Sequence, residues 1–148
     1  MVIPAFNEEA TLETIVRRVL EIPHLLEIVI VDDCSKDRTA LIGRALAATH
    51  PQVSYEKHAQ NAGKTEALKT GIALTHGQIV IVQDADLEYD PAEISDVIQP
   101  ILDGYADVVY GSRFLVRKAS SLILLSLHSQ QVSDLHVQSL DKHQHDGC

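Results

Sequence analysis

The chain has 148 residues, 45% of them hydrophobic, which predicts one soluble domain with its own hydrophobic core. Its formal net charge is −9, from 21 acidic residues against 12 Lys and Arg, and this argues against nonspecific binding of nucleic acid. Two distant cysteines, Cys34 and Cys148, argue against a disulfide framework or a zinc ribbon and indicate a reducing compartment.

Short apolar runs alternate along the chain with stretches whose apolar residues recur at helical spacing. The run EIVIVDDCS is nearly continuous and β-branched, as expected of a strand buried on both faces. Gly77 is the expected cap of the third helix. The predicted strands are 2–6, 27–35, 53–57, 78–83 and 107–111, and the predicted helices are 8–21, 39–49, 64–75 and 94–102.

This alternation predicts an α/β fold, an open and mostly parallel sheet with helices on its faces. Ligands of such folds bind beyond the carboxyl ends of the strands. Polar clusters stand at these positions in the sequence: FNEE, DDCS, DADLE and GSR. Four polar clusters at one edge of a sheet indicate a binding site there.

Acidic residues follow the fourth predicted strand at a spacing of two: Asp84, Asp86, Glu88 and Asp90. In an extended segment such residues point the same way, and like charges at this distance repel unless a cation lies between them. Oxygen ligands of this kind suit Mg²⁺ or Mn²⁺ beside substrate phosphates. We therefore interpret Asp84 and Asp86 as half of a metal–diphosphate site, and Asp90, before Pro91, as a helix cap.

Asp32 and Asp33 close the second predicted strand. An acid at this place can accept hydrogen bonds from a ribose or a base. The alternative is a polar turn, because Asp, Ser and Lys are common turn residues. The segment alone leaves both interpretations open.

The stretch NAGKTEAL ends like a phosphate-binding P-loop. The full pattern needs a glycine five residues before Gly63, and His58 stands there, so an ATPase is disfavoured. The structural interpretation is that Gly63 makes a turn and Lys64 begins a helix, from which Lys64 could reach a diphosphate.

Taken together, VIPAFNEE, IVIVDDCSKDRT, NAGKTEALKTGIALTHG, QDADLEYDP and VVYGSR resemble family 2 glycosyltransferases, in order and in spacing. The likeness is strongest to dolichol- or polyprenyl-phosphate mannosyl- and glucosyltransferases and covers residues 1–119. It implies a GT-A fold, Rossmann-like and here incomplete at its C-terminal side.

The resemblance implies transfer of a hexose from GDP-mannose or UDP-glucose to a polyprenyl or dolichyl phosphate, with Mg²⁺ or Mn²⁺. It implies a cytoplasmic enzyme, peripheral to the cytoplasmic face of a membrane. The acidic net charge predicts no nucleic-acid partner. No catalytic base is identified. The alternative is a truncated, inactive fragment that binds a nucleotide sugar.

The resemblance also implies roles for individual residues. Those that would contact the donor are Pro4, Phe6, Glu8, Val31, Asp33, Asp84, Ala85 and Arg113. Asp86 and Glu88 would hold the metal, with Glu88 where a Gln is common in the family. Arg113 could otherwise be an exposed arginine, and Thr65 departs from a frequent Gly.

The sequence changes in character after Ala119. Residues 120–148 carry no strand-end motif, and their apolar stretch LILLSL is too short to cross a bilayer. We expect this segment to be a poorly packed tail after a donor-binding half-domain, 1–119. A one-base shift of the reading frame would give an amino-acid sequence that resembles the segment following this region in the family. We therefore hypothesise that the tail is translated out of frame, and the nucleotide sequence of the gene tests this.

Overall fold

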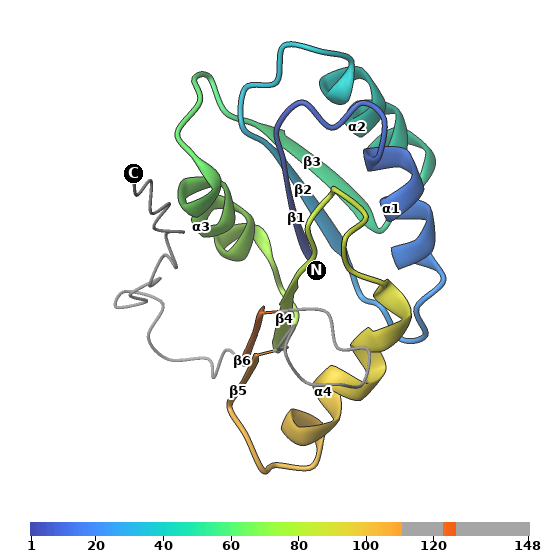
Figure 1. The fold of residues 1–148 in the computed structure, drawn as a ribbon, viewed down its shortest axis with the longest axis vertical. Helices are drawn as coiled ribbons and strands as arrows, with labels where there is room; N and C mark the ends of the chain where they lie inside the picture. Colours follow the sequence, from blue (N-terminus) through green and yellow to red (C-terminus); the bar gives the residue numbers. More distant parts are fainter. Residues whose placement is uncertain (111–122, 127–148) are drawn as a thin grey trace, which may run out of the picture.

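The computed structural model describes residues 1–110 and 123–126 of the chain (Figure 1). Strands and helices alternate within these residues, as the sequence predicts. The strands are β1 (Val2–Ala5), β2 (Ile28–Asp32), β3 (Val53–Lys57), β4 (Ile79–Val82), β5 (Val108–Tyr110) and β6 (Ile123–Ser126), and the helices are α1 (Leu12–Leu20), α2 (Thr39–Thr49), α3 (Lys64–Leu74), η1 (Pro91–Glu93, a 3-10 helix) and α4 (Ile94–Leu102).

The strands form a single sheet in the order β3-β2-β1-β4-β6-β5. β1 pairs in parallel with β2 and β4, and β2 pairs in parallel with β3. β6 lies between β4 and β5 and is antiparallel to both. The predicted α/β class, with an open and mostly parallel sheet, is confirmed.

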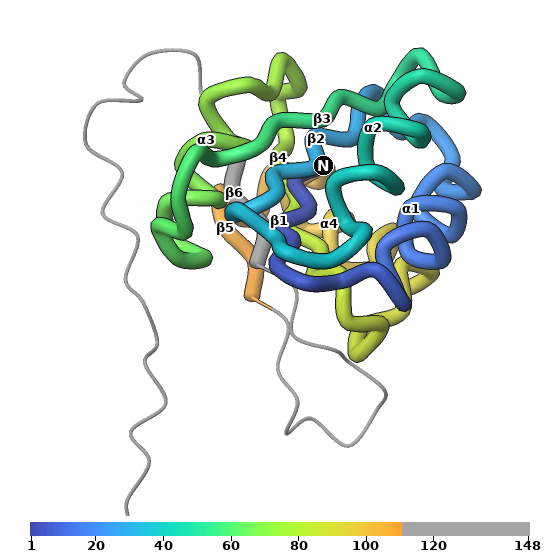
Figure 2. Tube along the Cα trace, turned by 90° about the horizontal axis from the view of Figure 1, so that it is seen from above, coloured from blue at the N-terminus to red at the C-terminus, as the bar shows by residue number. Residues whose placement is uncertain are grey.

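Helices cover both faces of the sheet (Figures 1 and 2). Along β1, Ile3 packs in the main core cluster with α1 residues, while Val2 packs against Leu68 of α3. β4 alternates in the same way, with Ile81 in the main cluster and Val80 toward α3. This two-sided burial explains why the central strands are nearly continuous apolar runs.

Helix α3 lies unusually close to the sheet because Gly71 faces β1. A Cβ atom at Gly71 would come within 2.3 Å of Val2 Cγ1, closer than any real carbon contact. The absence of a side chain at Gly71 therefore lets the helix approach the strand, and it sets the position of the loop that precedes α3.

Two predicted helices differ from the structure in their boundaries. Helix α1 begins at Leu12 rather than residue 8, because Asn7 has a positive φ of 58° and the Glu8 carbonyl accepts hydrogen bonds from the N–H groups of Thr11 and Leu12. Helix α3 ends at Leu74, before the predicted Gly77 cap.

Strand β6 falls inside the segment that the sequence analysis assigns to the tail. Residues 123–126 pair with β4 and β5. The division of the chain at residue 119 stays a prediction. The rest of the predicted tail lies outside the described residues. Among the helices that the structure describes, none is long and apolar enough to cross a membrane.

Candidate functional site

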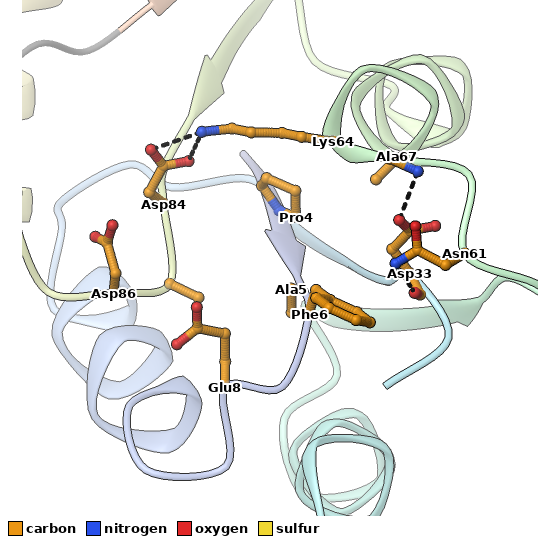
Figure 3. Close-up of a pocket in the computed structure, with 12 residues that line it drawn as sticks. Pro4, Ala5, Phe6, Glu8, Asp33, Asn61, Lys64, Ala67, Asp84 and Asp86 are labelled. Atoms are coloured by element: carbon orange, nitrogen blue, oxygen red, sulfur yellow. Dashed lines mark hydrogen bonds and ion pairs between the residues drawn. The ribbon is translucent and has the colours of Figure 1, made fainter. Parts of the chain in front are cut away.

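A cavity of about 380 Å³ opens at the carboxyl ends of β1, β2 and β4 (Figure 3). It lies at the edge where the sequence places its polar clusters. Its lining contains most of the predicted site residues and several others: Pro4, Ala5, Phe6, Glu8, Asp33, Asn61, Gly63, Lys64, Ala67, Asp84, Ala85 and Asp86. Ligands of open α/β sheets bind at this kind of position.

The cavity exists because β1 and β4 separate. Their pairing is limited to Val2 with Val82, whereas β1 remains paired with β2 as far as Ala5. Pro4 has no N–H group, so it cannot extend a ladder toward β4. The space between the two strands is then lined by Pro4 on one side and by Asp84 on the other.

The segment after β1 is fixed by hydrogen bonds that leave Phe6 exposed. The Asn7 N–H donates to Ser35 Oγ, and the Glu8 N–H donates to Thr39 Oγ1 at 2.7 Å. Thr11 Oγ1 donates to the Glu8 carboxylate at 2.6 Å. Phe6 is 46% exposed, an uncommon setting for a phenylalanine, and its ring extends from β1 on the side of the cavity where Asp33 lies (Figure 3).

Asp32 and Asp33 have different surroundings although they are adjacent. Asp32 is fully buried; it accepts hydrogen bonds from the Ser35 N–H and the Tyr55 hydroxyl, both at 2.7 Å, and Lys57 Nζ lies 3.4 Å away. Burial and the Asp32 carboxylate raise the pKa of Tyr55 well above its ordinary value, so the hydroxyl stays protonated and donates. Asp32 therefore holds the β2–α2 turn together, which is the structural interpretation of this acid.

Asp33 lines the cavity, but it also anchors the loop before α3. Its Oδ1 accepts hydrogen bonds from the Ala62 N–H at 2.9 Å and from His58 Nδ1 at 2.8 Å, and its Oδ2 accepts from the Gly63 N–H at 2.7 Å. Burial raises the pKa of the Asp33 carboxyl, but these donors outweigh it and hold the pKa below its usual range. Asp33 is thus ionised at neutral pH.

The loop before α3 is not arranged as a P-loop. Gly63 has a φ of +88° and is the N-cap of α3, whose first residue is Lys64. The structural interpretation of the sequence predicts this arrangement. The N–H groups of Ala62 and Gly63 point at the chain's own Asp33 carboxylate and not at an open phosphate site. This arrangement agrees with the sequence argument against an ATPase.

Lys64 spans the cavity to reach Asp84 (Figure 3). Its Nζ lies 2.6 Å from Asp84 Oδ1 and 2.8 Å from Oδ2. The lysine side chain is 59% exposed and Asp84 is 22% exposed, so water screens this ion pair. From the sequence, Lys64 is considered only as a residue that could reach a diphosphate, and Asn61 and Gly63 are not assigned to the site. Their signal is a polar loop after a strand that ends at the same edge of the sheet.

Asp84 and Asp86 line the same cavity, as the spacing of two predicts. The extended backbone that would point Glu88 the same way as these aspartates is interrupted, because Leu87 has a φ of +63° and turns the chain. The Glu88 N–H donates to Asp86 Oδ1 at 3.0 Å. Glu88 is exposed and is absent from the cavity lining, whereas Asp90 caps η1 by accepting from the Ala92 N–H, as predicted.

A divalent cation fits the two aspartates that face the cavity. Among the described residues no group of three or more His, Cys, Asp and Glu side chains could hold a metal ion alone. Mg²⁺ commonly takes one or two carboxylates and completes its shell with substrate phosphates and water. A pair of strand-end carboxylates in an open cavity is a donor set of this kind.

Two other predicted residues are not placed at the cavity by the structure. Val31 is fully buried and packs with Val29 and Ala67, on the α3 side of the sheet, so its side chain is not exposed to a ligand. Arg113 lies outside the described residues. Their predicted donor contacts stay predictions.

The chain matches the family model described as glycosyl transferase family 2, over residues 1–146. This range is longer than the 119 residues on which the resemblance rests. The chain is 37% identical over 121 residues to undecaprenyl-phosphate 4-deoxy-4-formamido-L-arabinose transferase of Pseudomonas aeruginosa, covering 74% of this chain and 33% of that protein. It is 33% identical over 117 residues to dolichol-phosphate mannosyltransferase of Pyrococcus furiosus, covering 78% and 33%.

Two solved structures resemble the fold. A mannosyltransferase of Pyrobaculum calidifontis in complex with GDP-Man and Mn²⁺ has a TM-score of 0.67 and 26% identity, over 75% of this chain and 34% of that one. Glucosyl-3-phosphoglycerate synthase of Mycobacterium tuberculosis, in complex with Mn²⁺, UDP and its product, has a TM-score of 0.57 and 28% identity, over 68% and 38%. The chain thus spans about a third of the length of the curated relatives it matches.

Proposed function

Because the chain belongs to glycosyl transferase family 2, we propose that its cavity binds a nucleoside diphosphate sugar and that it transfers the hexose of GDP-mannose or UDP-glucose to a polyprenyl or dolichyl phosphate. The observation that carries this proposal is the meeting of an aromatic ring, a buried aspartate, a lysine and a pair of strand-end aspartates in one cavity. These side chains come from three strand ends and one helix start.

The two sides of the cavity suit different parts of such a donor. Asp33 and Phe6 offer a hydrogen-bond acceptor and an exposed ring, which suit a nucleoside. On the side of β4, Lys64, Asp84 and Asp86 offer a cation and two potential metal ligands, which suit a diphosphate. We assign the nucleoside to the β2 side and the diphosphate to the β4 side.

Asp86, with Asp84 beside it, would hold the divalent cation, and Glu88 would need the turn at Leu87 to change before it joined them. The bound cation would stabilise the negative charge that develops on the departing nucleoside diphosphate. Lys64 is placed to exchange its carboxylate partner for the diphosphate, because its pair with Asp84 is exposed to water.

The acceptor is proposed from the relatives, whose names include undecaprenyl phosphate, dolichol phosphate and bactoprenol. An acceptor phosphate is already an anion and can attack the sugar with little help from a base. Such an acceptor lies in a membrane, so we propose peripheral association with its cytoplasmic face.

A second candidate is a fragment that binds the donor without turning it over. The cavity lining supplies side chains for a donor, and no catalytic base is identified among the described residues. In this case the cavity would bind a nucleotide sugar, and transfer to an added acceptor would not occur.

Calorimetric titration with UDP-glucose and GDP-mannose, with and without Mn²⁺, tests donor binding. We expect Mn²⁺ to strengthen binding of a donor, and we expect Asp86→Asn to remove that gain, because one of two metal-ligating carboxylates is lost. Asp96→Asn, which changes an exposed acid of α4 that does not line the cavity, is the matched control.

Donor binding that is the same in Asp86→Asn as in the parent, with both dependent on Mn²⁺, would refute the metal assignment. Failure of every donor to bind would refute the proposed function. Transfer of labelled hexose to polyprenyl phosphate by the full chain distinguishes the enzyme from the inactive fragment.

A further inference from the structure

We infer that the donor of this chain carries uracil rather than guanine, and that Asp33 makes the choice with His58 as its positioning residue. The inference rests on the proposed function, because it takes the cavity to be a nucleotide-sugar site. It goes further by naming the base of the donor, since the family resemblance allows both guanine and uracil.

The Asp33 carboxylate has little acceptor capacity left. A carboxylate offers about four lone-pair positions on its two oxygens. Oδ1 accepts from both the Ala62 N–H and His58 Nδ1, and Oδ2 accepts from the Gly63 N–H. Within the described residues, one acceptor position therefore remains, and it is on Oδ2.

The surroundings of Asp33 also restrict access to it. The side chain lines the cavity but is only 5% exposed, so little of its surface can contact a ligand. Two of its three donors are backbone N–H groups of the loop that lines the cavity. Rotating the carboxylate to free Oδ1 would leave these buried donors without an acceptor, which costs free energy.

His58 is held from both sides, and this fixes its hydrogen bond to Oδ1. Its Nδ1 lies 2.8 Å from Asp33 Oδ1, and its Nε2 lies 3.0 Å from Thr70 Oγ1. An ionised carboxylate can only accept, so Nδ1 carries the hydrogen of this bond. His58 thus occupies one of the acceptor positions of the Asp33 carboxylate.

The two bases differ in what they present to an aspartate. Uracil presents a single ring N–H between two carbonyl groups, which needs one acceptor. Guanine presents a ring N–H next to an amino group, a pair of donors that matches both oxygens of a free carboxylate. With only Oδ2 available, guanine would be left with one donor desolvated and unpaired, and such unpaired groups are costly.

The test is to titrate the full chain with UDP and with GDP in the presence of Mn²⁺ and to compare the two dissociation constants. We expect UDP to bind about tenfold or more tightly than GDP, the ratio that one unpaired buried donor produces. The wild-type ratio needs no variant, so loss of folding cannot confuse it.

The role of His58 is tested with His58→Ala, which frees an acceptor position on Oδ1. We expect the ratio of the two constants to shrink toward one, because guanine gains a second acceptor. A residue that only stabilises the fold would weaken both nucleotides equally and leave the ratio unchanged. His76→Ala is the control, since His76 is also a histidine paired with a carboxylate, but its partner is Glu27 rather than Asp33, and Glu27 does not line the cavity.

The possible outcomes distinguish the choice of base and the role of His58 from the proposed function. If GDP binds as tightly as UDP or more tightly, the choice of uracil is wrong while the proposed function stands. If His58→Ala leaves the ratio unchanged, His58 has no positioning role. If neither nucleotide binds, the proposed function fails and the inference falls with it.

Discussion

The acid pair that ends β2 and the acid pair that follows β4 occupy the same edge of the same sheet, yet they have opposite surroundings. Asp32 and Asp33 are buried and accept hydrogen bonds from several protein donors. Of the β4 pair, Asp84 is 22% exposed and paired with an exposed lysine, and Asp86 is exposed. The β2 pair is largely satisfied by the protein, whereas the β4 pair is more exposed to solvent.

This difference shows that position at the carboxyl end of a strand does not by itself define a ligand-binding acid. Donors that come from the chain decide how much of each carboxylate is left for a ligand. We expect the β2 pair to contribute mainly to stability and base choice, and the β4 pair to contribute to binding alone. The predictions that follow test this contrast.

The largest effect is expected for Asp32→Ala. The substitution leaves the Ser35 N–H, the Tyr55 hydroxyl and Lys57 without their buried acceptor, so the free energy of unfolding should fall by about 3 kcal/mol. Urea unfolding followed by circular dichroism measures it. Tyr55→Phe removes one donor and keeps the carboxylate, and should cost about 1 kcal/mol; equal losses in both variants would contradict the hydrogen-bond account.

The second-largest effect is expected in the pH dependence of stability, which should fall in acid. The pKa of both β2 aspartates is lowered in the folded chain: burial raises it, but hydrogen bonds to Asp32 and to Asp33 outweigh that effect. Groups of this kind stabilise the fold above their unfolded pKa, and the stabilisation is lost as the pH falls through the lowered values, below about pH 4.

Urea midpoints measured between pH 7 and pH 3 should therefore be level near neutrality and fall in the acid range. Asp33→Asn should be less stable at pH 7 and should show a shallower fall, because one of the titrating groups is gone. A slope as steep in Asp33→Asn as in the parent would remove Asp33 from the explanation.

The smallest effect on stability is expected in the β4 pair. Lys64→Gln removes the ion pair with Asp84, which is largely exposed, and should change the free energy of unfolding by no more than about 0.5 kcal/mol. Donor binding should nevertheless weaken, since the cavity loses its cation. A stability loss as large as that of Asp32→Ala would show that the two pairs do not differ as described.

The sequence predicts well what depends on local pattern. Leu12, Ile15, Val16 and Val19 recur at helical spacing and are all buried on α1. The near-continuous apolar run of β2 is buried throughout. The sheet edge that carries the cavity could be predicted because parallel strands bring their carboxyl ends together.

Features that depend on contacts distant in sequence could not be predicted. The donors to Asp33 come from His58, Ala62 and Gly63, and no local pattern states that they reach it. Leu87 turns the chain with a positive φ although it is not a glycine, so the separation of Glu88 from Asp86 is invisible in the sequence. The pairing of β6 with β4 joins segments that are distant in sequence, and no local pattern states it.

The position of β6 has a consequence for the order in which the sheet assembles. The β1–β2 and β2–β3 pairs join strands that are neighbours along the chain, whereas β5 reaches the parallel strands only through β6, among the strands described. Forming the β4–β6 ladder joins residues 79–82 to residues 123–126 and closes a long loop. The conformational entropy of this loop is lost before the contacts of the ladder stabilise the fold. We expect the β3-β2-β1 half to nucleate folding and the β6-β5 edge to be completed last.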